Sequence, residues 1–150
     1  MIIIVTGSNT ELIENDLNFP EIKTCFNSEW EDGIATSIAK GLKELLILSP
    51  DCDSCIFAVC DQPYITAAVF ENLITEYQNT SKGIVASAYA ETIGTPVLFN
   101  EKYFDELLEL QGHEGAKKII NRFIDDVIAV PFEKGNIDID TIEDYNKLIL

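Results

Sequence analysis

The sequence predicts an α/β fold in which a mainly parallel sheet carries helices on both faces. Segments typical of strands alternate with segments typical of helices along the 150 residues, as in chains built from βα units. Six consecutive apolar residues, 55–60, fit a strand that is buried on both faces. The next three residues are Asp61-Gln62-Pro63, and they place a carboxylate where open α/β sheets bind ligands, at the carboxyl end of a strand.

Six strands are predicted from short apolar runs that are bounded by turn residues. They cover residues 1–5, 22–26, 55–60, 83–89, 95–99 and 126–132. Pro63 ends the third of them, because proline has no N–H to donate to a ladder.

The predicted helices show apolar residues at helical spacing. In the clearest one, residues 31–48, Ile34, Ile38 and Leu42 share a face, and Ser49-Pro50-Asp51 ends it. Others are predicted around Leu12, after an N-cap at Thr66, over residues 101–110 and 115–123, and after a capping box that begins at Thr141.

Length and composition set the class of protein. One domain, residues 1–150, is expected, large enough to bury roughly 70% of its unfolded surface. The net charge of −16 excludes a nucleic-acid binder, which needs a basic face. No apolar run approaches the ~20 residues that span a bilayer, and residues 1–5 lack the basic flank of a secretory signal. We therefore expect a soluble, cytoplasmic protein that does not bind membranes.

The four cysteines are expected to be structural thiols. Cys52 and Cys55 have the spacing of a redox or zinc pair, but the single histidine, His113, is far away in sequence. Cys55 and Cys60 also lie in the apolar run, where cysteine packs as a small hydrophobic residue.

Asp61 is the strongest candidate for chemistry. A carboxylate at this edge of a sheet is a natural ligand for Mg²⁺ and, through the metal, for phosphates. The alternative is that Asp61 only terminates the strand and caps the next turn.

Three further segments are candidates, each with an ordinary structural alternative. The entry to the long helix, from Asn27 to Ser37, offers free N–H donors for an anion, or these residues simply cap the helix. Gly94-Thr95-Pro96 permits close approach of a ligand, or forms an inter-strand turn. Of the two acids Asp138 and Asp140, one points into a site, or both only lead into the last helix.

In this order and spacing, these segments resemble the molybdenum-cofactor cytidylyltransferase-like (MobA-like) nucleotidyltransferases. The resemblance covers essentially the whole chain. It rests on Asn27, Trp30, Gly33 and Ser37, on Asp61-Gln62-Pro63, on residues 94–99, on residues 112–116 and on residues 138–144.

The resemblance implies a fold, a reaction and a site. The fold would be a Rossmann-like three-layer sandwich of the nucleotide-diphospho-sugar transferase type. The enzyme would transfer CMP or GMP from CTP or GTP to a phosphorylated acceptor such as molybdopterin, releasing pyrophosphate. Asp61 would be catalytic, and Asp61 with Asp140 (or Asp138) would bind Mg²⁺. Nucleotide-binding residues would be Asn27, Gly33, Ser37 and Asp61, and acceptor-binding residues would be Gly94, Thr95, Pro96 and His113.

The chain also departs from the family pattern. Thr95 replaces a usual His and His113 replaces a usual Asp, so the acceptor side differs. The family's Gly-rich triphosphate loop with its Arg and Lys is missing, and Thr6-Gly7-Ser8-Asn9 has no phosphate-loop signature. We therefore expect an N-terminally truncated domain that is completed by a separate N-terminal piece or in a homodimer. The alternative is a catalytically inactive remnant or subunit that binds a nucleotide, a pterin or a partner protein.

Overall fold

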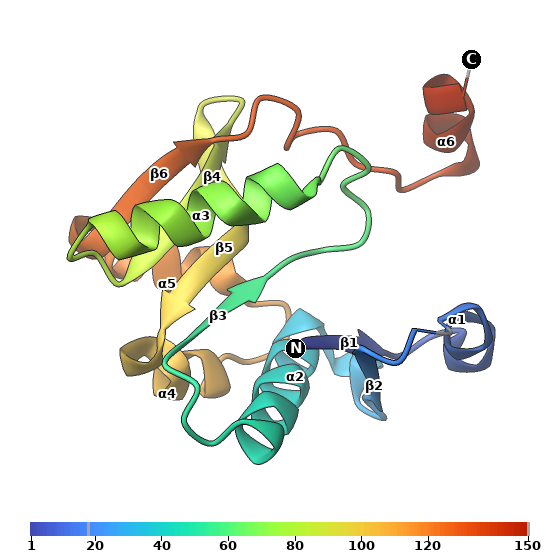
Figure 1. Cartoon of the computed structure of the whole chain (residues 1–150). Helices are drawn as coiled ribbons and strands as arrows, with labels where there is room; N and C mark the ends of the chain where they lie inside the picture. Colours follow the sequence, from blue (N-terminus) through green and yellow to red (C-terminus); the bar gives the residue numbers. More distant parts are fainter. Residues whose placement is uncertain (18, 150) are drawn as a thin grey trace. The chain divides into compact units, whose positions relative to one another are not determined.

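The computed structural model describes residues 1–17 and 19–149 (Figure 1). The chain forms two units: the first comprises Met1–Asp53 and Glu101–Ile119, and the second comprises Ser54–Asn100 and Ile120–Leu150. The helix α5 (Ala116–Arg122) continues from the first unit into the second. Every predicted strand and helix is present, most of them within a few residues of the predicted bounds.

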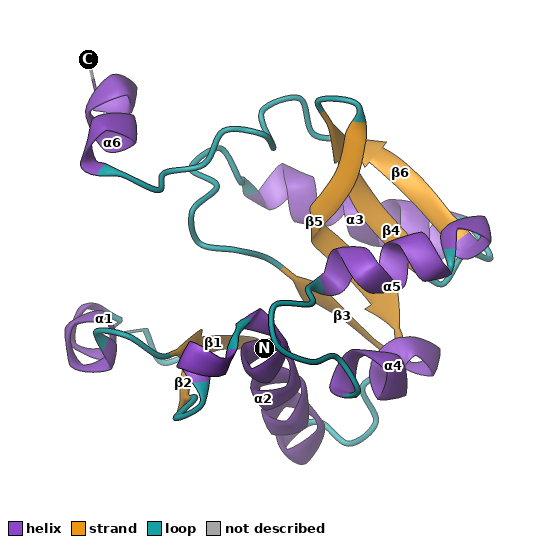
Figure 2. Cartoon of the chain, turned by 180° about the vertical axis from the view of Figure 1, so that it is seen from behind, coloured by secondary structure: helices purple, strands orange, loops and turns teal. Residues whose placement is uncertain are grey.

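The first unit contains a two-stranded parallel sheet. Strands β1 (Ile2–Thr6) and β2 (Ile22–Phe26) pair in register from Ile2↔Ile22 to Thr6↔Phe26, with the short helix α1 (Thr10–Asp16) between them in the chain (Figure 2). The backbone N–H of Asn27 donates to the carbonyl of Thr6 over 2.8 Å and so continues the ladder past β2.

Helix α2 (Ile34–Leu48) packs against β1 and against α4 (Phe104–Leu108). At Gly41 a Cβ would lie 2.8 Å from the Val5 side chain, so glycine lets helix and strand approach closely. The predicted start at residue 31 was wrong. Residues Trp30–Asp32 form a separate 3-10 turn, η1, because Gly33 has a backbone φ of 110° that no α-helix contains.

The second unit contains a four-stranded sheet in the order β3-β5-β4-β6 (Figure 2). The strands are β3 (Ser54–Phe57), β4 (Ile84–Tyr89), β5 (Thr92–Asn100) and β6 (Val127–Pro131). Strand β4 is parallel to β6, and β5 is antiparallel to both β3 and β4, so three strands run in one direction and β5 runs against them.

Helix α3 (Ala67–Asn79) lies across β4, β5 and β6 (Figure 1). Its Leu73 is fully buried against Val85, Leu98 and Val130, which form the core of this unit. The predicted N-cap position, Thr66, has the extended backbone of an N-cap, although its side chain makes no capping hydrogen bond.

Strand β3 is shorter and less buried than predicted. The sequence predicts a strand over residues 55–60 that is buried on both faces, whereas β3 ends at Phe57 and its four residues are only partly buried. Phe57 pairs with Val97. Because the strands are antiparallel, the ladder would continue to Pro96, the residue before Val97 in β5, and proline has no N–H to donate.

The remaining segments are short. The 3-10 turns η2 (Glu101–Tyr103) and η3 (Ile124–Asp126) precede α4 and β6. The last helix, α6 (Ile142–Ile149), begins at the predicted capping box, in which the Asp144 N–H donates to Thr141 Oγ1 over 3.2 Å. No helix among the described residues is long and apolar enough to cross a membrane.

We expect Leu73→Ala to lower the free energy of unfolding by about 2–5 kcal/mol, because it removes a fully buried side chain from the core of the second unit. Urea titration followed by circular dichroism measures the change. Ile74→Ala, in the neighbouring position of α3 with 42% of the side chain exposed, is the matched control and should cost less than about 1 kcal/mol. Equal losses would contradict this core.

Candidate functional site

The predicted site residues fall into two groups, one in each unit. The first unit brings four of them to the start of α2: Asn27, Gly33, Ser37 and, in the facing turn, His113. The second unit holds Asp61, Gly94, Thr95, Pro96 and Asp140. Each group is organised by a buried amide side chain.

In the first unit the buried amide belongs to Asn27. Its Nδ2 donates to Thr36 Oγ1 over 2.9 Å and to Ser37 Oγ over 3.0 Å, and its Oδ1 accepts the N–H of Glu29 over 3.0 Å. Both amide hydrogens therefore have partners inside the fold. Asn27 fixes the position of Ser37 at the start of α2, and its predicted contact with a nucleotide stays a prediction.

Gly33 is required by a close approach of two backbones. A Cβ on Gly33 would lie 2.2 Å from the carbonyl oxygen of Gly112, and its φ of 110° is strained for other residues. The same Gly112 carbonyl accepts the N–H of Ala35 over 3.1 Å. The turn that carries His113 is thus attached to the first turn of α2, with His113 itself exposed.

A cavity of about 460 Å³ lies beside this turn, within the usual size range of small-molecule sites. Its lining includes Asn27, Thr36 and Gly112 together with two lysines of α2, Lys40 and Lys43. Sequence reasoning missed the lysines. They stand three apart on a helix, which is a spacing that surface lysines often have without any ligand.

In the second unit the buried amide belongs to Gln62. Its Nε2 donates to the carbonyl oxygen of Gly135 over 2.6 Å and to that of Thr95 over 3.3 Å. The N–H of Ile139 donates to the carbonyl oxygen of Asp61 over 2.8 Å. These three bonds attach the loop after β3 both to β5 and to the loop after β6.

Thr95 and Pro96 form an irregularity in β5. The register with β4 passes from Ala86↔Val97 directly to Ser87↔Gly94, so that Thr95 and Pro96 are skipped. Their carbonyl groups find other donors: Ser87 Oγ donates to Pro96 over 2.7 Å, and Gln62 donates to Thr95. The bulge turns these residues out of the ladder, as bulges beside active sites do.

Tyr89 fills the space between two glycines. A Cβ on Gly94 would lie 2.5 Å from the Tyr89 hydroxyl oxygen, and one on Gly135 would lie 2.3 Å from the Tyr89 ring. Phe132 packs edge-on against the same ring, with centroids 6.2 Å apart. The turn before β5 is formed by Ala90 and Glu91, both with positive φ, rather than by residues 92–96, which belong to β5.

Three carboxylates in the second unit interact electrostatically. Desolvation is the largest cause that raises the pKa of Asp138, and the negative charges of Asp61 and Asp140 raise it further. Asp61 Oδ1 is buried and has no hydrogen-bond partner among the described residues. Within residues 1–17 and 19–149, however, no three Asp, Glu, His or Cys side chains lie close enough to form a metal site alone. A cation here would need ligands from a bound phosphate as well, which is how Mg²⁺ usually binds.

The cysteines make no disulfide. All four are thiols, and burial, with a smaller effect of Glu44, raises the pKa of Cys25. Cys25 is therefore a protonated core residue at neutral pH.

The contacts of Gln62, Tyr89 and Gly135 were not predicted from the sequence. Gln62 was noted only as part of a motif, and its two acceptors lie 33 and 73 residues away. A glycine between charged and polar residues, as at Gly135, carries no signal by itself, and the reason for it appears only when the Tyr89 ring is in place.

Comparison with known proteins identifies similar sequences and folds. A family model described as the MobA-like NTP transferase domain matches residues 1–127, and no curated protein matches the chain. Rv0371c from Mycobacterium tuberculosis H37Rv has a similar structure, with a TM-score of 0.76 and 23% identity over 98% of this chain and 74% of that one. The complex of Rv0371C with manganese has a TM-score of 0.74 and 21% identity over 97% of this chain and 76% of that one.

A third similar structure is the molybdopterin-guanine dinucleotide biosynthesis protein A from Archaeoglobus fulgidus. Its TM-score is 0.67, with 18% identity over 97% of this chain and 75% of that one. At these identities the structures establish the fold, and they confirm the predicted α/β class with helices on both sides of a sheet.

We expect Gly33→Ala to lower the free energy of unfolding by at least about 2 kcal/mol, because its Cβ would clash with Gly112 at a strained φ. Gly115→Ala is the matched control, since its Cβ would meet only the Ile34 side chain at 3.8 Å. It should cost less than about 1 kcal/mol. Denaturant titration measures both, and a tolerated Gly33→Ala would refute the close approach.

Proposed function

The chain belongs to the family of MobA-like NTP transferase domains, which are nucleotidyltransferases, and from this premise we propose its reaction and its site. We propose that it transfers CMP or GMP from CTP or GTP to a phosphorylated acceptor such as molybdopterin, with release of pyrophosphate. The A. fulgidus protein, whose fold this chain shares, acts in molybdopterin-guanine dinucleotide biosynthesis and supports a pterin acceptor.

The observation that carries this proposal is the environment of Asp61. Asp61 has a buried, unpartnered carboxylate oxygen and lies near enough to Asp138 to raise its pKa, which creates a negative site that a divalent cation would neutralise. The residues therefore fit a metal, and Asp61 with Asp140 would hold it. We propose Mg²⁺, and the manganese complex of Rv0371C supports the use of a divalent metal in this fold. When bound, the metal would neutralise charge on the nucleotide phosphates.

The protein residues position the reactants. Gln62 holds the loop of Asp61 against Thr95 and Gly135, which limits how far the carboxylate can move from the acceptor segment. Phosphoryl transfer depends mainly on such positioning and on charge neutralisation. We assign acceptor binding to Gly94, Thr95 and Pro96, which the bulge of β5 displaces from the sheet.

The start of α2 is the proposed nucleotide-binding region. Gly33 and Ser37 lie at the N-terminus of α2, where the helix dipole favours an anion, and the Ala35 N–H of this turn already donates to the Gly112 carbonyl. Asn27 supports this role by orienting Ser37. His113 lies in the turn that Gly112 attaches to the same helix end, which supports an acceptor contact there. One family model covers residues from both units, which supports a single domain.

We also propose that a separate polypeptide, or a second copy of the chain, completes the triphosphate site. The sequence contains no Gly-rich loop with Arg or Lys. Within the described residues β1 pairs with β2 alone, so its other edge is open to a parallel strand. A strand that ends in a Gly-rich basic loop would supply both the missing pairing and the missing cations.

The direct test is pyrophosphate release from CTP or GTP with Mg²⁺ or Mn²⁺ and a pterin phosphate, with and without a peptide carrying an apolar strand and a Gly-rich basic loop. We expect metal-dependent release in the complete mixture. Asp61→Asn should abolish the metal-dependent binding of nucleotide, because it removes the charge of the buried ligand. Asp51→Asn, at an exposed turn of the first unit, is the control and should leave binding unchanged.

The outcomes separate the candidate functions. Metal-dependent nucleotide binding without turnover in every mixture would favour the inactive, ligand-binding subunit. Unchanged nucleotide binding in Asp61→Asn would show that Asp61 has only a structural role in the loop after β3.

A further inference from the structure

We propose that Lys134 binds a phosphate group at the site of Asp61, with Tyr64 holding the lysine when no phosphate is bound. The inference rests on the proposed function and adds a residue that the sequence did not single out.

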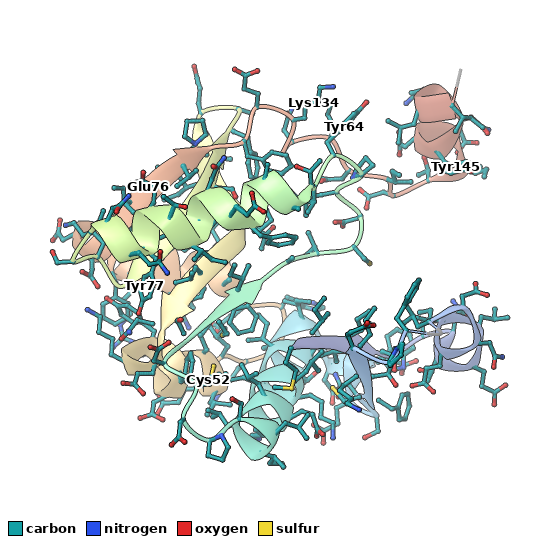
Figure 3. The ribbon with its side chains drawn as sticks, in the orientation of Figure 1. Cys52, Tyr64, Glu76, Tyr77, Lys134 and Tyr145 are labelled. Carbon is teal, nitrogen blue, oxygen red and sulfur yellow. The ribbon has the colours of Figure 1, made fainter. Side chains whose placement is uncertain are left out.

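Lys134 and Tyr64 lie side by side on two loops of the second unit (Figure 3). The Lys134 Nζ stands 4.1 Å from the centroid of the Tyr64 ring, which is the geometry of a cation–π contact. Tyr64 follows Asp61-Gln62-Pro63 directly, and Lys134 precedes Asp138 by four residues. The contact therefore joins the two loops that carry the candidate metal ligands.

The backbone beside Lys134 is fixed. The carbonyl of Gly135 accepts the buried hydrogen bond from Gln62 over 2.6 Å, and the missing Cβ of Gly135 leaves room for the rings of Tyr89 and Phe132. The backbone position of Lys134 is thus set by packing, while its long side chain is exposed. Such a side chain can exchange an aromatic ring for a phosphate without rearranging the loop.

The other cations of the second unit are engaged elsewhere. Lys82 donates to the carbonyl of Asp125, Lys147 pairs with Asp144, and Arg122 lies over the ring of Phe123. Lys134 is the cation of this unit whose loop hydrogen-bonds to the loop of Asp61.

The charges at the site explain why a lysine is needed. A divalent metal held by Asp61 and Asp140 would offset only part of the negative charge that these two carboxylates and a bound phosphate bring together, so a nearby cation would compensate some of the rest. An ammonium group is a compact donor to phosphate oxygens, and its bonds to them are charge-assisted. A cation–π contact between the exposed Lys134 side chain and the half-buried Tyr64 ring is weaker than a charge-assisted bond to phosphate and can be released in exchange.

The test compares the binding of Mg²⁺–GTP, Mg²⁺–CTP, Mg²⁺–pyrophosphate and inorganic phosphate by isothermal titration calorimetry. Lys134→Met should weaken binding of at least one of these about tenfold, the loss expected for a charge-assisted bond. Lys134→Arg should restore most of the affinity. Lys82→Met is the matched control, since Lys82 precedes β4, at the opposite end of that strand from Tyr89, and should change none of the affinities. Unfolding midpoints establish that each variant is folded.

The pattern of losses identifies the source of the phosphate. A loss for the nucleotides and pyrophosphate alone places Lys134 on the triphosphate, and a loss for inorganic phosphate alone places it on the acceptor phosphate. Wild-type affinity in Lys134→Met for all four probes, or no binding of any probe by the wild-type chain, would overturn the inference. If Lys134→Met is neutral while Asp61→Asn abolishes nucleotide binding, the inference fails and the proposed function stands.

Discussion

The hydrogen bonds of the Gln62 side chain are the interaction on which the second unit's site depends. One amide group reaches two carbonyls, on β5 and on the loop after β6, and does so in a buried environment. Losing a buried hydrogen bond leaves its acceptors unsatisfied, which costs more than the bond itself contributes. The bond from Ile139 to the carbonyl of Asp61 adds a second connection between the same loops. Together they fix the segment from Lys134 to Asp140 beside Asp61.

This arrangement explains how loops can hold the proposed site residues in fixed positions. The strands supply a rigid frame, and the bulge at Thr95 and Pro96 turns two carbonyls away from the ladder toward Ser87 and Gln62. Tyr89 then packs between Gly94 and Gly135, so that the proposed acceptor segment, Gly94-Thr95-Pro96, and the loop after β6 both pack against one aromatic ring. In the first unit the Asn27 side chain has the corresponding role: it donates to two hydroxyl groups at the start of α2 and so fixes their positions.

The sequence was sufficient for the fold because periodicity and turn residues are local signals. It placed α3, β2 and the capping box at Thr141 almost to the residue. It overestimated β3, because the apolar run does not reveal that its partner strand contains Pro96 at the next position. It also named the motif residues of the site without their contacts. The acceptors of Gln62 are distant in sequence, and the ring over which Lys134 lies is a property of the folded loops.

Hydrogen–deuterium exchange of the segment 134–140 in Gln62→Met tests whether the Gln62 side chain fixes this segment beside the loop of Asp61. Methionine keeps the size of the side chain and removes both donors, so we predict faster exchange of the Ile139 amide with unchanged protection of β4 and β5 amides. Gln78→Met, at an exposed position of α3, should exchange like the wild type. Wild-type protection of the Ile139 amide in Gln62→Met would show that the Gln62 side chain does not fix this segment.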